Sequence, residues 1–167
     1  SDYYGQQFFG THFFNPPRYM HLVELIAHDG TNTELMTALG KWIELRLGKG
    51  IVVASDTINF IANRIGVMSI QATMKHMNEL GLSIETVDLL TRPLIGHPNF
   101  ATFHTMNIDG LDTFLHVAHN VYEGVPNDPF REIFAAPAWV KTLVEKGHMG
   151  QKSGNKGCYK KDKSKDG

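Results

Sequence analysis

Residues 8–26, FFGTHFFNPPRYMHLVELI, contain two short apolar segments separated by a turn. The first segment, residues 8–14, is aromatic and β-prone, and the Asn-Pro-Pro at 15–17 ends it because proline cannot donate to a strand ladder. The second segment, residues 22–26, is another strand candidate, whose apolar run is interrupted by Glu24. The stretch therefore predicts two neighbouring strands that carry one histidine and one carboxylate.

A helix and a third strand are predicted downstream. Thr31 and Glu34 have the spacing of a capping box, in which a hydroxyl and a carboxylate bind each other's free backbone amides. Apolar residues at helical spacing follow as far as Gly48, which ends the helix. Residues 51–53, Ile-Val-Val, are apolar enough to form a strand buried on both faces. This strand–helix–strand order is typical of one edge of an α/β sheet.

Beyond residue 55 the pattern is helical throughout. The expected helices run from about Phe60 to Leu80, from Ser83 to Arg92, from Asp109 to Gly124, and from Pro137 to Gly147. We therefore expect a mainly α chain: the end of an α/β domain over residues 1–54, an all-helical domain over 55–160, and a polar tail over 161–167.

Composition excludes several classes of function. Sixteen Lys and Arg against seventeen Asp and Glu give a net charge of −1, so no global basic field attracts nucleic acid. The strongly apolar stretches, such as residues 51–54, are far shorter than the ~20 residues of a membrane span. A single cysteine, Cys158, excludes an intrachain disulfide and a cysteine-based zinc site, and we expect a reducing, cytoplasmic setting.

His12 and Glu24 are the most informative pair. A buried carboxylate needs a hydrogen-bond partner, and an imidazole on the neighbouring strand is a natural one. Such a carboxylate fixes the tautomer of the ring and leaves the other nitrogen free to accept a proton, as in a general base. The alternative is a structural His–Glu bridge at the edge of a sheet. His116 and His119 share a helical face, but no acidic or cysteine partner is placed to complete a metal site, so we expect none.

Four motifs, in the same order along the chain, resemble those of the L-3-hydroxyacyl-CoA dehydrogenases. They are GTHFFNPP at 10–17 with Met20-x-Leu22-Val23-Glu24, Asp56-Thr57-x-x-Phe60-Ile61-x-Asn63-Arg64, PLIG at 93–96 with GLDT at 110–113, and Gly154-x-x-Gly157-x-Tyr159. The first resembles the signature of the family, and the second resembles the segment that opens its helical C-terminal domain. The sequence at 16–19, PPRY, is most similar to the bacterial fatty-acid oxidation members.

The resemblance implies a fold and a set of roles. The fold is the end of a Rossmann-type NAD domain followed by a helical domain like the C-terminal domain of 6-phosphogluconate dehydrogenase. His12 would take the 3-hydroxyl proton while hydride leaves for NAD, and Glu24 would orient its imidazole. Asn63 would help to hold the substrate and the histidine, and Asn15 would lie near the nicotinamide carboxamide. From the residues alone, Asn63 is a surface amide of a helix and Asn15 is a turn-forming residue before proline.

The chain also departs from the family. No Gly-x-Gly-x-x-Gly follows a strand and opens a helix, and only eleven residues precede His12, so the active-site serine upstream is absent as well. Cys158 stands where the family usually has phenylalanine. The chain opens without methionine, so we expect a piece of a longer enzyme that is inactive alone, with an acyl-CoA substrate and a homodimer formed through its helical domain. The alternatives are a non-catalytic helical dimerisation module and a relative that acts on another hydroxy acid.

Overall fold

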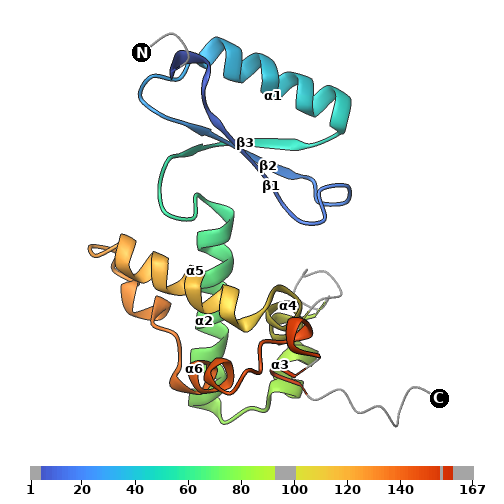
Figure 1. The fold of residues 1–167 in the computed structure, drawn as a ribbon, viewed down its shortest axis with the longest axis vertical. Helices are drawn as coiled ribbons and strands as arrows, with labels where there is room; N and C mark the ends of the chain where they lie inside the picture. The colour runs from blue at the N-terminus through green and yellow to red at the C-terminus, as the bar shows by residue number, and fades with distance from the viewer. Residues whose placement is uncertain (1–4, 93–100, 155, 160–167) are drawn as a thin grey trace, which may run out of the picture. The chain divides into compact units, whose positions relative to one another are not determined.

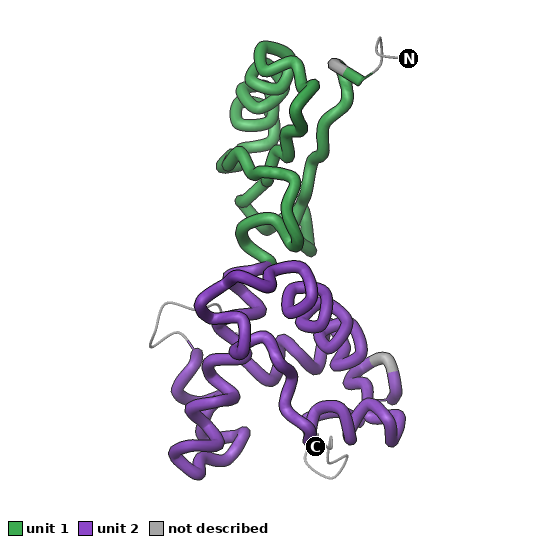
Figure 2. The backbone as a smooth tube through the Cα atoms, turned by 90° about the vertical axis from the view of Figure 1, so that its left-hand side faces the viewer, with its two compact units in different colours: residues 1–63 green, residues 64–167 purple. Residues whose placement is uncertain are grey.

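The computed structural model describes residues 5–92, 101–154 and 156–159 (Figure 1). The chain divides into two compact units, Ser1–Asn63 and Arg64–Gly167 (Figure 2). The motif at 93–96, His97 and the tail over 161–167 lie outside the described residues. The architecture is the expected one, a small three-stranded sheet with one helix followed by a helical region.

The first unit is built on a sheet with the strand order β1–β2–β3. Its elements are the 3₁₀ turn η1 (Gly5–Gln7), β1 (Gly10–Phe13), β2 (Leu22–Ala27), α1 (Thr33–Leu47) and β3 (Gly50–Ser55). β1 and β2 are antiparallel, whereas β2 and β3 are parallel and are joined through α1. This β2–α1–β3 crossover is the unit that the strand–helix–strand pattern predicts.

Side chains on the two faces of β2 alternate between two environments because successive residues of a strand point to opposite sides. Val23 and Leu25 pack against Met36 and Ile43 of α1 and form the core of this unit. Glu24 lies between them in sequence and therefore faces the other side of the sheet. There it is directly opposite His12 of β1.

Two local expectations for this unit are wrong. The N-cap of α1 is Asn32, whose side chain accepts from the amides of Glu34 and Leu35, each at 3.0 Å. The Thr31 hydroxyl accepts instead from the amide of His28, because the helix begins at Thr33 and puts Thr31 outside the cap. β3 is not buried on both faces: Val53 is 57% exposed, since α1 packs over β2 and the start of β3 only.

The second unit is helical. Its elements are α2 (Ala62–Leu80, whose first two residues belong to the first unit), α3 (Ile84–Leu90), α4 (Thr102–Asp109), α5 (Leu111–Gly124), η3 (Arg131–Phe134), α6 (Ala138–Glu145) and η4 (Gln151–Ser153). The predicted stop at Gly81, with φ of 62°, and the predicted cap at Ser83 are both confirmed. α5 packs against α4, η3 and α6, and Gln71 of α2 donates to the carbonyl of Phe134 in η3.

The sequence pattern does not predict α4. Its N-cap residue, Ala101, has no side-chain oxygen with which to cap the helix. Asp88 of α3 supplies the cap instead, accepting from the amides of Phe103 at 2.8 Å and of His104 at 3.2 Å. The Tyr159 hydroxyl also donates to Asp88 and ties the end of the described chain to this cap. No helix in the described ranges is both long and apolar enough to cross a membrane.

Candidate active site

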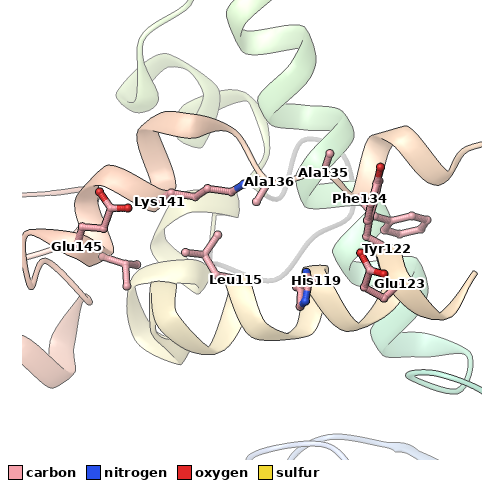
Figure 3. Close-up of a pocket in the computed structure, with 10 residues that line it drawn as sticks. Leu115, His119, Tyr122, Glu123, Phe134, Ala135, Ala136, Lys141 and Glu145 are labelled. Atoms are coloured by element: carbon pink, nitrogen blue, oxygen red, sulfur yellow. The ribbon is translucent and has the colours of Figure 1, made fainter.

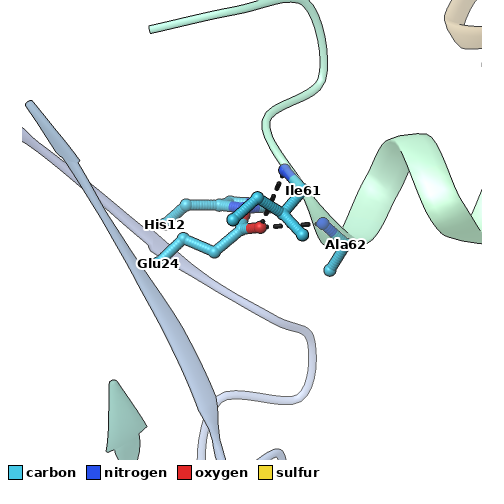
Figure 4. A network of polar contacts seen from close by, with 4 residues as sticks. All are labelled: His12, Glu24, Ile61 and Ala62. Atoms are coloured by element: carbon cyan, nitrogen blue, oxygen red, sulfur yellow. Dashed lines mark hydrogen bonds and ion pairs between the residues drawn. The ribbon is translucent and has the colours of Figure 1, made fainter. Parts of the chain in front are cut away.

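The side chains of His12 and Glu24 meet on the face of the sheet opposite α1 (Figure 4). The Nδ1 atom of His12 lies 2.7 Å from Oε2 of Glu24, a distance typical of a charge-assisted hydrogen bond. The antiparallel register places the two residues directly across from each other on β1 and β2. The predicted pair is therefore brought together by the pairing of two strands.

Glu24 is completely buried, and both of its carboxylate oxygens are satisfied. Oε1 accepts from the backbone amides of Ile61 at 3.1 Å and of Ala62 at 2.8 Å (Figure 4). These amides lie at the start of α2, where a helix has free N–H groups and a partial positive charge. A buried carboxylate here is thus stabilised by one imidazole and one helix end.

The hydrogen bonds determine the charge of Glu24. Burial alone raises the pKa of this carboxyl, but the hydrogen bonds from His12, Ala62 and Ile61 together outweigh it, so the pKa lies below its ordinary value. Glu24 is therefore a carboxylate at neutral pH. A carboxylate can only accept, so the hydrogen on Nδ1 of His12 is the one shared between them.

A turn in the left-handed conformation positions the two backbone amides that bind Glu24. Asn59 and Phe60 both have positive φ, 59° and 49°, a conformation that costs a non-glycine residue of order 1–3 kcal/mol. The turn directs the amides of Ile61 and Ala62 to the carboxylate. It also places the Phe60 ring 5.7 Å, centroid to centroid, from the imidazole of His12.

The second ring nitrogen of His12, Nε2, is available for chemistry. The side chain is 27% exposed, and Nε2 has no hydrogen-bond partner among the described residues. Phe14 covers another side of the imidazole, with ring centroids 4.6 Å apart. With Nδ1 protonated toward Glu24, Nε2 carries a lone pair and can accept a proton from a bound molecule.

The other two predicted site residues are nearby in sequence but are not hydrogen-bonded to this pair in the described structure. Asn63 lies in the first turn of α2, one residue after Ala62, and is exposed. Asn15 is exposed in the loop between β1 and β2. Their roles stay predictions. The amides of Ile61 and Ala62 were not predicted as part of the site, because a backbone donor has no signature in the sequence.

A separate pocket of about 560 Å³ lies within the second unit (Figure 3). Its walls come from α5, from the segment after η3 and from α6, and they include His119, Glu123, Lys141 and Glu145. His116, the other half of the helical histidine pair, lies 3.2 Å from the side-chain nitrogen of Asn120. Across the described ranges, no three His, Cys, Asp or Glu side chains gather as metal ligands would.

The residues present fit only part of an NAD site. The strand–helix–strand crossover of the described chain is β2–α1–β3. In that crossover the first free amides of α1 are already bound by the side chain of Asn32, so they are not available to a phosphate. The amides at the start of α1 thus form no cradle for the pyrophosphate.

Two family models match consecutive parts of the chain. The model of the 3-hydroxyacyl-CoA dehydrogenase NAD binding domain matches residues 4–57, and that of the C-terminal domain of the same enzymes matches residues 60–161. The order of the two matches is that of the two regions of the structure. The match to an NAD binding domain supports NAD as the cofactor.

Individual relatives agree with the family models. A probable 3-hydroxyacyl-CoA dehydrogenase of Bacillus subtilis is 45% identical over 162 residues, which are 97% of this chain and 20% of the relative. A protein of the same name from Deinococcus radiodurans is 44% identical over 163 residues, 98% of this chain and 46% of the relative. The crystal structure of (S)-3-hydroxybutyryl-CoA dehydrogenase from Ralstonia eutropha superposes with a TM-score of 0.81 at 28% identity, covering 96% of this chain and 54% of that one.

The chain spans less than half the length of the two curated relatives. Even so, the two family models between them cover nearly all of its sequence, in the order in which the sheet and the helical region occur. The chain belongs to the 3-hydroxyacyl-CoA dehydrogenase family.

Proposed function

We propose that this chain forms part of an NAD-dependent 3-hydroxyacyl-CoA dehydrogenase of fatty-acid β-oxidation, with His12 as its general base. The observation that carries the proposal is the imidazole of His12, held through Nδ1 by a buried carboxylate while Nε2 has no hydrogen-bond partner among the described residues. The resemblance of residues 16–19 to bacterial fatty-acid oxidation enzymes supports the pathway.

In the oxidative direction, Nε2 of His12 takes the proton of the 3-hydroxyl group as the alcohol becomes a ketone. NAD, when bound, accepts the hydride from C3 of the substrate. The imidazole becomes cationic, and the carboxylate of Glu24, 2.7 Å away, stabilises that cation. In the reverse direction the imidazolium returns the proton to the developing alkoxide. A positioned base of this kind contributes roughly 10²–10⁴-fold to the rate.

Two asparagines complete the proposed site. Asn63 follows the amides that bind Glu24, so a substrate near His12 would meet the first turn of α2. We assign it to holding the substrate and the imidazole. Asn15 begins the loop after the strand of His12, and we assign it to the nicotinamide carboxamide.

We propose further that residues 1–54 are the end of the NAD domain, that 55–160 are the helical domain, and that 161–167 are a polar tail. The isolated chain is inactive in this proposal because the residues that the structure describes include no cradle for the cofactor phosphates. The parent enzyme would be cytoplasmic, as a user of NAD and acyl-CoA esters. It would dimerise through the helical domain, where Leu80, Leu89 and Leu90 expose apolar surface.

A hybrid enzyme tests the proposal. This chain would replace the matching 162 residues of the Bacillus subtilis relative, and the oxidation of NADH by acetoacetyl-CoA would be followed. We expect turnover by the hybrid, a loss of about 10²–10⁴-fold in the H12Q hybrid, and none from the isolated chain. An H12Q hybrid as active as its parent would overturn the assignment of His12. Turnover by the isolated chain would overturn its proposed inactivity.

The proposed dimer has its own test. Light scattering of the chain should give the mass of a dimer, and L89E should shift it toward the monomer if the exposed leucines form the interface. T33E, which changes an exposed residue of α1 in the first unit, is the control. A strict monomer at all concentrations would contradict a dimer formed by this chain.

A further inference from the structure

We propose that Lys49 is a positioning residue of the active site, which holds the loop that follows the strand of His12. The inference rests on the proposed function, because it names a residue that acts on His12 and Asn15 through the loop. Lys49 itself touches neither of them in the described contacts.

The ammonium group of Lys49 binds two carbonyl oxygens of the β1–β2 loop. Nζ donates to the carbonyl of Pro17 at 2.5 Å and to that of Met20 at 2.6 Å. Charge-assisted bonds of this kind are roughly twice as strong as neutral ones. Lys49 is half-buried, whereas the loop residues that it binds are exposed.

The main chain on either side of Lys49 binds the same loop. The amide of Gly50 donates to the carbonyl of His21 at 2.8 Å, and Nδ1 of His21 lies 3.4 Å from the carbonyl of Gly48. Gly48 ends α1 in the left-handed conformation, with φ of 62°, which turns the chain back toward β2. The turn between α1 and β3 thus serves as an anchor for the loop.

The loop has few other restraints. The amides of Tyr19 and Met20 both donate to the carbonyl of Pro16, at 3.0 Å each, and these bonds are internal to the loop. Among the described contacts, Lys49 supplies the side-chain bonds that tie its central residues to the rest of the unit. Removing the ammonium group therefore loosens the loop at Pro17 and Met20, while the bonds of His21 to the turn and the core beneath α1 remain.

Movement of this loop reaches the site through two residues. Phe14, at the start of the loop, packs its ring on the imidazole of His12 with centroids 4.6 Å apart. Asn15 follows directly and lies two residues before Pro17, whose carbonyl Lys49 holds. A loop that shifts at Pro17 therefore moves the aromatic cover of His12 and the side chain of Asn15 together.

The substitutions K49M and K49R separate this role from packing. Methionine keeps most of the aliphatic stem and removes every donor, whereas arginine keeps the charge and several donors. K41M is the matched control, because Lys41 is an exposed lysine of α1. On the whole chain, backbone ¹⁵N relaxation would report the order of the amides of Arg18, Tyr19 and Met20.

We expect K49M to lower the order parameters of these three amides and to weaken the nuclear Overhauser effects between the protons of Phe14 and His12. The K49R and K41M variants should behave like the wild type in both measurements. In the hybrid enzyme we expect kcat/KM to fall about tenfold in K49M and to recover in K49R. Unchanged loop amides in K49M, unchanged kcat/KM, or a K49R variant as impaired as K49M would each overturn the proposal.

Different results would show that the proposed function itself is wrong. An inactive wild-type hybrid, or an active H12Q hybrid, would refute the role of His12 in catalysis. The relaxation measurement on the chain alone would still decide whether Lys49 holds the loop against His12.

Discussion

Replacing Glu24 with glutamine separates the charge of this side chain from its shape. The carboxylate accepts three hydrogen bonds, from His12 and from the amides of Ile61 and Ala62. Glutamine has one acceptor oxygen, which can remain with the two amides, and one NH₂ group, which then faces Nδ1 of His12. A donor at that place requires the imidazole to carry its hydrogen on Nε2. The nitrogen that should accept the substrate proton would then be blocked.

The two consequences of E24Q are a loss of stability and a loss of rate. Exchanging three charged hydrogen bonds for neutral ones reduces the free energy of unfolding by about 3–4.5 kcal/mol, because each charged bond is worth about 1.5–3 and each neutral bond about 0.5–1.5 kcal/mol. Losing the base costs roughly 10²–10⁴-fold in rate. At about 1.4 kcal/mol for each factor of ten, this is about 3–5.5 kcal/mol of transition-state stabilisation. The two losses are therefore of similar size, so each needs its own measurement.

The assay compares E24Q with E44Q, which changes an exposed glutamate of α1. Denaturant unfolding of the chain gives the change in stability, and NADH oxidation by the hybrid enzyme gives kcat. We expect E44Q to match the wild type in both measurements. An E24Q enzyme within about threefold of wild-type kcat would refute the idea that this carboxylate sets the state of the imidazole.

Three further predictions follow from the described contacts. The pKa of Glu24 is lower in the folded chain than its ordinary value of 4.5. The contribution of Glu24 to stability should therefore be complete above pH 4.5 and be lost as the pH falls through the pKa of the folded chain. The urea midpoints of the wild type and of E24Q should accordingly converge in acid. Burial, and then the charge of Asp88, raise the pKa of Cys158 to about 12. The thiol should therefore react with Ellman's reagent at pH 8 far more slowly in the folded chain than in the unfolded chain. Equal rates in the two states would contradict the burial of this thiol. Gly150 has φ of 91°, and a Cβ at this position would lie 3.1 Å from the Cα of Asn107. The substitution G150A should therefore reduce the free energy of unfolding by more than ~2 kcal/mol and lower the melting temperature by several degrees. An unchanged melting curve would contradict the tight backbone contact.

Much of the fold can be predicted from local sequence signals. The left-handed stop at Gly81 and the side-chain cap at Ser83 are encoded within a few residues of the helix ends that they form. α4 is different, because its cap is supplied by Asp88 from another helix and no nearby residue signals its start. The shift of the cap from Thr31 to Asn32 shows that two neighbouring polar residues can satisfy the same pattern, and only the position of the first helical turn decides between them.

The candidate site also has parts that the sequence predicts and parts that it does not. A charge within an apolar strand predicts that Glu24 has a partner, and the antiparallel register supplies His12. The amides of Ile61 and Ala62 depend on the left-handed turn at Asn59 and Phe60. Asparagine tolerates that conformation, but nothing in the sequence predicts it for the phenylalanine that follows. Lys49 appears in the sequence as an ordinary turn lysine, since its partners are main-chain carbonyls of a distant loop.

The most direct measurement is the ¹⁵N spectrum of the imidazole of His12 in the wild-type chain at alkaline pH. We expect a protonated Nδ1, with its hydrogen strongly deshielded by the bond to Glu24, and an unprotonated Nε2. A ring protonated on Nε2, or one that averages rapidly between both tautomers as a free histidine does, would contradict the claim that a buried carboxylate holds this imidazole ready to accept a proton.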